Sequence, residues 1–321
     1  MTGYDALRNS AAWLDLSARG RIKMTGEDRA RLLHALTTNH IQQLTPGTGC
    51  YAFFLNDKGR ILSDVNILSR PDHFLLDLEP ETREKIYQHL DHYIIADDVT
   101  LEDITDQTAA VGVEGPRAAE VLQALGAPVP ETECASEDWG HRLVARLSST
   151  GSLGFFLVVP AGEKAELIGK LEAAGAVAAD PEAARLLRLE HGKPRYGEDI
   201  TERFLAQEAN QPHALHFSKG CYLGQEIVER VRSRGQIHRV LMPLILDTDQ
   251  LPNPGAKLES GEATVAEITS AAYSPARKKV VALAYVKTEF ARPHEQLRLD
   301  GIQAEVSAPL GPEGVPANPC A

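Results

Sequence analysis

The chain has few cysteines, no long apolar run and no excess of positive charge, and each absence argues against a class of protein. Its four cysteines, at positions 50, 134, 221 and 320, include no close pair of the kind that holds zinc or an iron–sulfur cluster. No apolar stretch reaches the length of a membrane span, and residues 1–5 lack the character of a leader, so we expect a cytoplasmic protein with no membrane partner. The net charge of -12 argues against nucleic acid as a partner, because duplex binding needs a broad positive surface.

The first third of the chain predicts an α+β unit. At 321 residues, with 43% hydrophobic and 24% charged residues, the chain has the composition of a globular protein of two or three packed units. A helix is expected at 27–40. Two strands follow at 50–55 and 60–69, joined by the turn residues Asn56-Asp57-Lys58-Gly59. A strand at 73–78, a helix at 81–95 and a strand at 99–104 are expected after them. The order β-β-α-β favours a split α+β sandwich over a doubly wound sheet.

The middle of the chain repeats this order, and the last part differs. Strands are expected at 109–113, 142–147 and 155–159, and helices at 117–125, 164–174 and 182–191. We therefore expect two α+β units, at about 1–106 and 107–234. Short strand-like runs at 240–246, 263–269, 280–287 and 296–299 then predict a small antiparallel β-barrel at 235–321, with a loose end at 309–321 that is rich in Pro and Gly.

The most informative motif is Lys-Gly-Cys-Tyr-Leu-Gly-Gln-Glu at 219–226. Residues 219–239 contain five Lys or Arg against two Glu, a basic island in an acidic chain, which indicates an anion-binding site. If Gly220 makes the turn and Tyr222 begins a helix, the Cys221 thiol lies at a helix N-terminus, where the helix dipole favours the thiolate. Lys219 would then pair with the thiolate or with a carboxylate of the ligand. The alternative for Cys221 is a buried cysteine that packs as a small hydrophobic residue.

This motif resembles the signature of the folate-binding YgfZ branch of the glycine-cleavage T-protein superfamily, Lys-Gly-Cys-Tyr-x-Gly-Gln-Glu. Further stretches across nearly the whole chain are similar to that superfamily, at 25–28, 37–39, 55–60, 189–192, 196–197, 268–270, 273–275 and 282–283. The resemblance implies a T-protein-like ring of two α+β units plus the barrel, around a central site for tetrahydrofolate. It also implies an auxiliary role in the assembly or repair of iron–sulfur clusters, with Cys221 as a functional thiol and with client or assembly proteins as partners.

The same resemblance assigns residues to the folate. It places Glu190 at the pterin, whose ring N–H and 2-amino group one carboxylate can accept together; the alternative is a solvated acid at a helix end. Tyr196 would pack against the pterin or fill the core. Four arginines would form a cationic mouth for the glutamate tail of folate, or else a solvated helix face, and these are Arg230, Arg232, Arg234 and Arg239.

Asp64 corresponds to an aspartate that assists attack at the folate nitrogen in the transferase relatives. The local sequence Leu62-Ser63-Asp64-Val65 has one carboxylate where the transferases typically have two acids. A strand-end acid that faces water is therefore the alternative for Asp64. A folate-dependent aminomethyltransferase, or a related one-carbon transferase, is the alternative function.

No metal site is expected. The histidine pairs His89/His92 and His213/His216 have a helical i, i+3 spacing that a metal can use. Neither pair has a cysteine or an acid in ligand register, so exposed histidines are the better interpretation.

Overall fold

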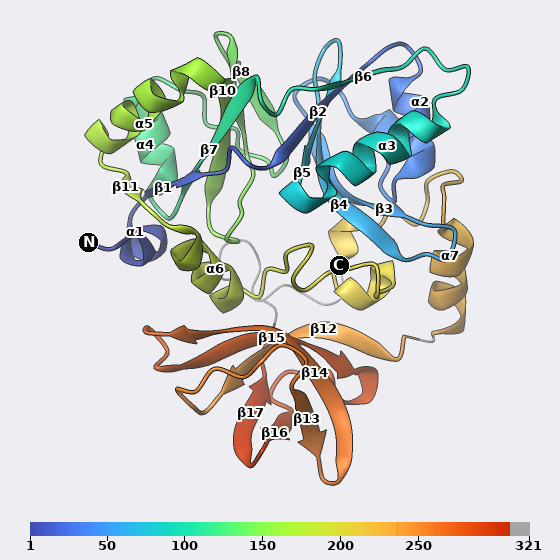
Figure 1. Ribbon diagram of the computed structural model, residues 1–321, viewed down its shortest axis with the longest axis vertical. Helices are drawn as coiled ribbons and strands as arrows, with labels where there is room; N and C mark the ends of the chain where they lie inside the picture. Colours follow the sequence, from blue (N-terminus) through green and yellow to red (C-terminus); the bar gives the residue numbers. More distant parts are fainter. Residues whose placement is uncertain (236, 309–321) are drawn as a thin grey trace.

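The computed structural model describes residues 1–235 and 237–308. Two α+β units lie side by side, and a closed barrel lies below both of them, with helix α6 and the chain that follows it in between (Figure 1). Among the described residues, none of the helices is long and apolar enough to cross a membrane.

The first unit is a five-stranded sheet with the strand order β3-β4-β5-β2-β6. Its strands are β2 (Gly20–Thr25), β3 (Gly49–Leu55), β4 (Ile61–Ser69), β5 (Phe74–Leu78) and β6 (Thr100–Asp103), and its helices are α2 (Arg29–Leu36) and α3 (Arg83–Tyr93). The predicted hairpin, the strand at 73–78 and the helix at 81–95 are confirmed. The helix predicted at 27–40 is shorter, because Thr37 is extended and bridges to Phe54 in β3.

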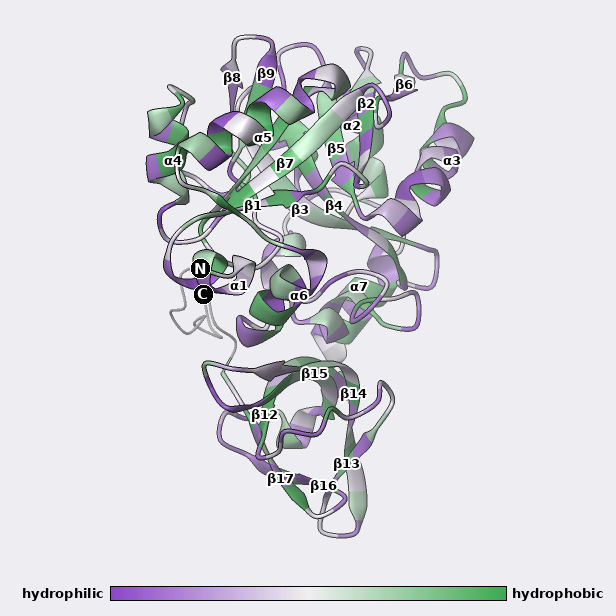
Figure 2. Ribbon diagram, turned by 60° about the vertical axis from the view of Figure 1, so that its left-hand side comes forward, coloured by the Kyte–Doolittle hydropathy of each residue, from purple (hydrophilic) through white to green (hydrophobic). Residues whose placement is uncertain are grey.

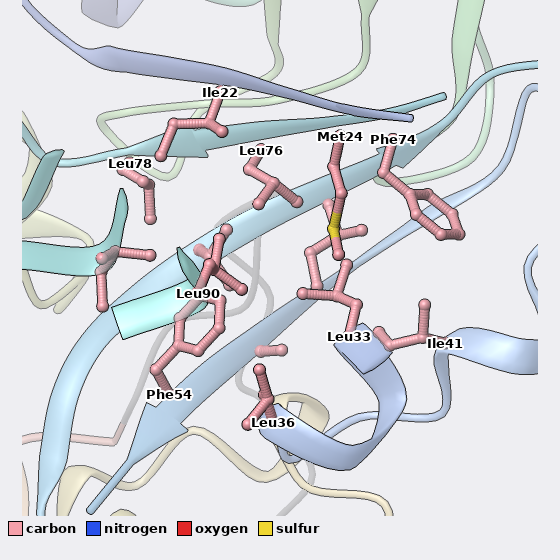
Figure 3. Packing of buried hydrophobic residues seen from close by; sticks show 14 of the residues in the cluster. Ile22, Met24, Leu33, Leu36, Ile41, Phe54, Phe74, Leu76, Leu78 and Leu90 are labelled. Atoms are coloured by element: carbon pink, nitrogen blue, oxygen red, sulfur yellow. The ribbon is translucent and has the colours of Figure 1, made fainter. Parts of the chain in front are cut away.

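One face of this sheet forms a hydrophobic core with α2 and α3. Leu33 and Leu36 of α2 and Leu90 of α3 pack against Met24 and Phe54 of the strands, and all five are buried (Figure 3). Because successive strand residues point to opposite faces, the other face of β3 and β4 is left to carry different side chains.

The second unit is a six-stranded sheet with the order β11-β1-β7-β10-β9-β8. Its strands are β1 (Ala12–Asp15), β7 (Thr108–Glu114), β8 (Ser136–Trp139), β9 (Arg142–Ala145), β10 (Gly154–Pro160) and β11 (Val177–Ala178), and its helices are α1 (Gly3–Asn9), α4 (Ala118–Ala124), α5 (Lys164–Ala173) and α6 (Pro181–Glu190). The helices predicted at 164–174 and 182–191 are confirmed. The division expected near residue 106 does not separate the two sheets, because β1 pairs with β7 and belongs to the second sheet. Hydrophobic residues run along β7, whereas the helices α4 and α5 carry hydrophilic stretches (Figure 2).

Helix α7 (Gln225–Arg234) leads into the barrel, whose strands close in the order β12-β15-β14-β13-β16-β17. They are β12 (Arg239–Leu246), β13 (Lys257–Ser260), β14 (Ala263–Ser274), β15 (Lys279–Lys287), β16 (Gln296–Leu299) and β17 (Ile302–Val306). Short 3-10 helices complete the structure, at Ile41–Gln43, Pro80–Thr82, Ala161–Glu163, Ala206–Ala209, Pro212–Ala214 and Thr288–Phe290. The tail at 309–321, expected to be loose, and Cys320 lie outside the described residues.

Candidate functional site

A large cavity of about 1180 Å³ lies where the two units meet the chain between α6 and α7. The first sheet contributes Tyr51 from β3 and Asp64 from β4, on the face turned away from α2 and α3. The second sheet contributes Phe156, and the chain after α6 contributes Lys193 and His213. Its volume is somewhat above the usual range for small-molecule sites, so the cavity has room for an extended ligand.

Asp64 is a buried acid in this cavity. The carboxylate accepts a hydrogen bond from the Tyr51 hydroxyl over 2.9 Å, and the residue is only 9% exposed. Burial, and then the negative charge of Glu79, raise the pKa of Asp64 to about 6. Burial and the Asp64 carboxylate likewise raise the pKa of Tyr51, so its hydroxyl stays protonated. The alternative of a strand-end acid facing water is therefore wrong.

A second carboxylate lines the same cavity, although the sequence around Asp64 has only one. Glu79, directly after β5, is paired with Arg19 and, over 2.9 Å, with Arg195. Burial opposes its ionisation, but the two guanidinium groups outweigh burial and hold the pKa of Glu79 below its usual value. Ser63, at the place of the missing acid, points the other way and donates to Thr82. The two acids thus come from β4 and from the residue after β5, so the sequence next to Asp64 does not reveal the pair.

The cations that line the cavity differ in whether a carboxylate already holds them. Arg19 forms a two-point contact with Asp77 at 2.9 and 2.7 Å, and Arg185 and Arg188 contact Glu198. Arg146 stands over the ring of Phe155. Neither Arg146 nor Lys193 has an ion pair among the described residues, so the ammonium group of Lys193 is available to an anionic ligand.

Glu190 is not among the residues that line the cavity, contrary to the expectation that it faces the ligand. Its carboxylate is buried and accepts hydrogen bonds from the Tyr4 hydroxyl at 2.7 Å and from Ser274 of the barrel, and it is paired with Arg8 at 2.7 Å. The solvated helix-end acid is equally wrong. Glu190 joins α1, α6 and β14, which is a structural position.

Tyr196 also lies outside the cavity lining. Its side chain is buried in a cluster with Phe53, Ile200 and Val228, and its hydroxyl donates to the Ile61 carbonyl over 3.3 Å. The position matches the core-filling alternative. The aromatic residues at the cavity include Tyr51 and His213, whose ring centroids lie 5.2 Å apart.

Of the four arginines expected at a cationic mouth, Arg230, Arg232 and Arg239 do not line the cavity. Arg230 and Arg232 are exposed on α7, and Arg232 stands over Phe217. Arg239 is paired with Glu208 over 3.0 Å. Arg234 ends α7, but its side chain lies outside the described part of the chain. Ile227 of α7 lies against Gly59 in the β3–β4 hairpin, and the helix lies at the outer edge of the molecule (Figure 1).

The Lys219–Cys221 segment is arranged differently from its prediction. Helix α7 begins at Gln225, after Gly224, so Cys221 is not at the helix N-terminus. Cys221 is exposed, which contradicts the buried alternative. Lys219 is 6% exposed and donates to the backbone carbonyls of His34 and Thr37, both over 2.5 Å. It therefore holds the end of α2 and does not pair with the thiolate or with a ligand in the cavity.

The other described cysteines are not equivalent to Cys221. Burial raises the pKa of Cys50 to about 12 and that of Cys134 to about 12. No group of three or more His, Cys, Asp or Glu in the described ranges is placed to hold a metal ion.

The chain was compared with known proteins. The GCVT N-terminal domain family matches residues 2–219, and the glycine cleavage T-protein C-terminal barrel domain family matches residues 239–310. The chain therefore belongs to the glycine-cleavage T-protein family.

Its relatives and structural neighbours agree with this assignment. An aminomethyltransferase of Rubrobacter xylanophilus is 30% identical over 296 residues, which are 89% of this chain and 78% of the relative. An aminomethyltransferase of Thermoanaerobacter is 26% identical over 92% of this chain and 83% of its own length. A chloroplastic protein of Arabidopsis thaliana named as a transferase is 29% identical over 83% of this chain, which spans 63% of that protein. The crystal structure of glycine cleavage system aminomethyltransferase T from Bartonella henselae has a TM-score of 0.89 over 98% of this chain and 90% of its own, at 22% identity, and shows that the fold is shared.

Proposed function

We propose that this protein binds tetrahydrofolate, or a one-carbon derivative of it, in the central cavity. The observation that carries the proposal is the cavity of about 1180 Å³ with the buried Asp64 beside Tyr51 on its wall. A reduced pterin presents N–H donors that a carboxylate accepts, and the aromatic middle of folate needs apolar or aromatic walls. Tyr51, His213 and Phe156 provide such walls.

The far end of folate carries one or more glutamate carboxylates. Lys193 and Arg146 are lining cations without an ion pair among the described residues. The charges of Glu133 and Lys193, which both line the cavity, act on the His213 ring, which in turn neighbours Tyr51. The cavity wall therefore runs from an acid, through two aromatic rings, to a cation. This order of groups matches the pterin, the aminobenzoyl ring and the glutamate of folate. In this proposal Lys193 binds the glutamate carboxylates of folate, the role that was predicted from the sequence for the four arginines.

We infer further that the protein is an auxiliary factor of the YgfZ kind that supports the assembly or repair of iron–sulfur clusters. The support is the motif at 219–226, which leaves Cys221 exposed on the surface while Cys50 is half-buried and Cys134 is buried. One cysteine cannot hold a cluster alone, so the thiol would act on a cluster client or on an assembly protein.

The second candidate is a folate-dependent aminomethyltransferase. Two observations favour it: the names of the bacterial relatives, and the presence of Glu79 as a second acid in the cavity with Asp64. The pKa of Asp64 near 6 is suitable for a group that exchanges a proton at neutral pH.

Two measurements separate the candidates. Titration calorimetry with 5-formyltetrahydrofolate should give a binding heat that Asp64→Asn reduces, and the absence of any heat in the wild type would refute the folate proposal. Incubation with tetrahydrofolate and an aminomethyl-lipoyl carrier should then give no methylene-tetrahydrofolate if the protein is auxiliary. Product formation would establish the transferase. In the auxiliary case, Cys221→Ser should bind folate but fail to restore the activity of iron–sulfur enzymes in a strain that lacks the protein.

A further inference from the structure

Three histidine rings meet where the chain after the cavity residue His213 lies on helix α2. The ring centroids of His34 and His40 are 4.7 Å apart and those of His40 and His216 are 5.1 Å apart, both in edge-to-face contact. His34 belongs to α2, His40 comes shortly after that helix, and His216 follows His213. This histidine cluster (His34, His40 and His216) therefore joins two segments that are distant in the sequence.

The polar atoms of the histidine cluster are buried without partners. The Nδ1 atoms of all three rings are buried and have no hydrogen-bond partner among the described residues. His34 as a whole is only 7% exposed. A protonated imidazole carries an N–H at both ring nitrogens, so each buried Nδ1 would become a charged donor without an acceptor. The packing therefore favours uncharged rings.

The charged groups that act on His34 are all basic. They are the Lys219 ammonium and the rings of His40 and His216, and within the described part of the chain no carboxylate is among them. Lys219 is buried, and burial lowers its pKa to about 7, so it carries its full charge at acidic pH. The other titratable groups near Lys219 are Cys50 and Tyr222. Burial raises the pKa of each to about 12, so neither supplies a negative charge.

Hydrogen bonds on both sides of His216 attach residues 213–223 to α2 and to the residues that follow this helix. The Thr38 hydroxyl donates to the Ala214 carbonyl over 2.6 Å, and the His216 amide donates to the Thr38 carbonyl over 3.0 Å. Further along, the Leu223 amide donates to a carbonyl of α2 over 3.0 Å. Only turns lie between residues 215 and 224, so this stretch depends on such contacts for a fixed position.

We propose that the histidine cluster makes this attachment acid-sensitive, so that a proton on His34 detaches residues 213–223 from α2 and a ligand in the cavity keeps them attached. His213 is the link to the cavity, because its ring lines the wall and its carbonyl accepts a hydrogen bond from the Asn39 amide over 2.9 Å. The ligand half of the proposal rests on the proposed function, since it takes a reduced folate as the ligand.

The direction of the pH effect follows from the surroundings of His34. Burial, and then the charge of Lys219, lower the pKa of His34 to about 4, against 6.5 for an ordinary histidine. The ring therefore binds its proton more tightly in the detached form, where it reaches water. The stability of the attached form is fully present above pH 6.5 and is lost as the pH falls towards 4. From these two values, His34 alone should make detachment about tenfold more favourable at about pH 5.5 than at about pH 7.5.

Hydrogen exchange of the full chain without ligand measures the detachment. The protection factors of the His216 and Leu223 amides should fall about tenfold between about pH 7.5 and 5.5, whereas those of the α3 amides should not. His34→Leu should remove this fall. His89→Leu is the matched control and should keep it, because His89 also has a buried nitrogen without a partner among the described residues but lies on α3. No fall in the wild type, or a fall that persists in His34→Leu, would overturn the proposal.

A measurement on the wild type keeps the test decisive if His34→Leu folds poorly. In a nuclear magnetic resonance titration, the His34 ring should take up its proton well below the pH at which the exposed His92 does. A His34 ring that titrates together with His92 while residues 213–223 stay protected would overturn the proposal.

The ligand half has its own readout. At about pH 5.5, saturating 5-formyltetrahydrofolate should restore the protection of the His216 and Leu223 amides, because a ligand that binds the attached form shifts the equilibrium towards it. Calorimetric binding without restored protection would overturn the ligand half and leave the folate proposal standing. A lack of binding even at about pH 7.5 would overturn the folate proposal together with the ligand half, whereas the acid-dependent detachment is decided without any ligand.

Discussion

The Tyr51 hydroxyl donates a 2.9 Å hydrogen bond to the Asp64 carboxylate, and the two residues come from neighbouring strands that both face the cavity. The bond favours the carboxylate form, whereas burial and the charge of Glu79 oppose it more strongly, so the pKa of Asp64 is about 6. Because Tyr51 keeps its proton, Asp64 is the member of the pair whose charge changes near neutral pH.

Replacing Asp64 with Asn should stabilise the folded protein at neutral pH. The carboxyl binds its proton more tightly in the folded protein, with a pKa of about 6, than in the unfolded chain, with a pKa of 3.8. Wild-type stability is therefore lost as the pH rises from about 4 through 6, and the variant has no such loss. Two pKa units correspond to about 2–3 kcal/mol, so the advantage of Asp64→Asn should grow from near zero at about pH 4 to about 2 kcal/mol at about pH 7.5.

Urea unfolding of both proteins across this pH range measures the difference. Asp57→Asn is a matched control, since Asp57 is an exposed aspartate in the turn of the same hairpin, and exposed substitutions usually change stability by less than about 0.5 kcal/mol. A pH-independent difference for Asp64→Asn would contradict the argument.

Glu190→Ala should reduce stability and spare ligand binding. The substitution leaves the Tyr4 and Ser274 hydroxyls and the Arg8 guanidinium without their acceptor, where α1, α6 and the barrel meet. We expect a loss of about 2–3 kcal/mol in the free energy of unfolding. Calorimetry well below the unfolding temperature should give an unchanged folate affinity. Asp91→Ala, at an exposed acid on α3 that does not line the cavity, should change neither quantity. A stable Glu190→Ala protein that no longer binds folate would restore the assignment made from the sequence.

The elements that sequence reasoning identified are those with strong local signals. The hairpin at 50–69 has alternating apolar residues and an Asn-Asp-Lys-Gly turn, and α6 begins with Pro181, which suits a first helical position. The elements that it missed include α1, β1, β2, β8, β13 and β17. These elements have four to seven residues each, which is too few to show a clear periodicity of hydrophobic residues. In addition, β1 pairs with a strand about 100 residues away in the sequence.

The site was harder to predict than the fold, for a physical reason. The family resemblance pointed directly to Asp64, but its partners Tyr51 and Glu79 come from β3 and from the residue after β5. The alternation of strand residues contained one signal for the site. Tyr51 shares a face of β3 with Phe53 and Leu55 and is the one of the three that has a polar group. Glu190, Arg230 and Arg232 were misplaced because a motif specifies residue types and not the direction in which a helix presents them.

Glu114→Ala should loosen the loop at 148–151, which forms part of the cavity wall. The Glu114 carboxylate is fully buried and accepts five hydrogen bonds from the backbone and hydroxyl groups of Ser148, Ser149 and Thr150. Its removal leaves these donors unpaired, so we expect a loss of about 3 kcal/mol in stability. Hydrogen exchange of the loop amides should become faster, and folate affinity should fall. Glu120→Ala, at an exposed site on the following helix, is the control and should leave the loop unchanged. An unchanged loop in Glu114→Ala would contradict the prediction and would mean that other contacts hold the loop.

Lys193→Met should weaken folate binding and Arg230→Met should leave it almost unchanged, although both substitutions remove one positive charge. Lys193 lines the cavity without an ion pair among the described residues, whereas Arg230 is exposed on α7 and absent from the cavity lining. A charge-assisted hydrogen bond to a carboxylate contributes about 1.5–3 kcal/mol, so Lys193→Met should weaken binding of a folate monoglutamate about tenfold or more. Arg230→Met should change it less than about twofold, because exposed charges at a distance are screened by salt. Calorimetry at two salt concentrations measures both, and the salt dependence should shrink only in Lys193→Met. If Arg230→Met instead gave the larger loss, the glutamate tail would lie at α7, where the sequence first placed it, and the order of groups along the cavity wall would have to be abandoned.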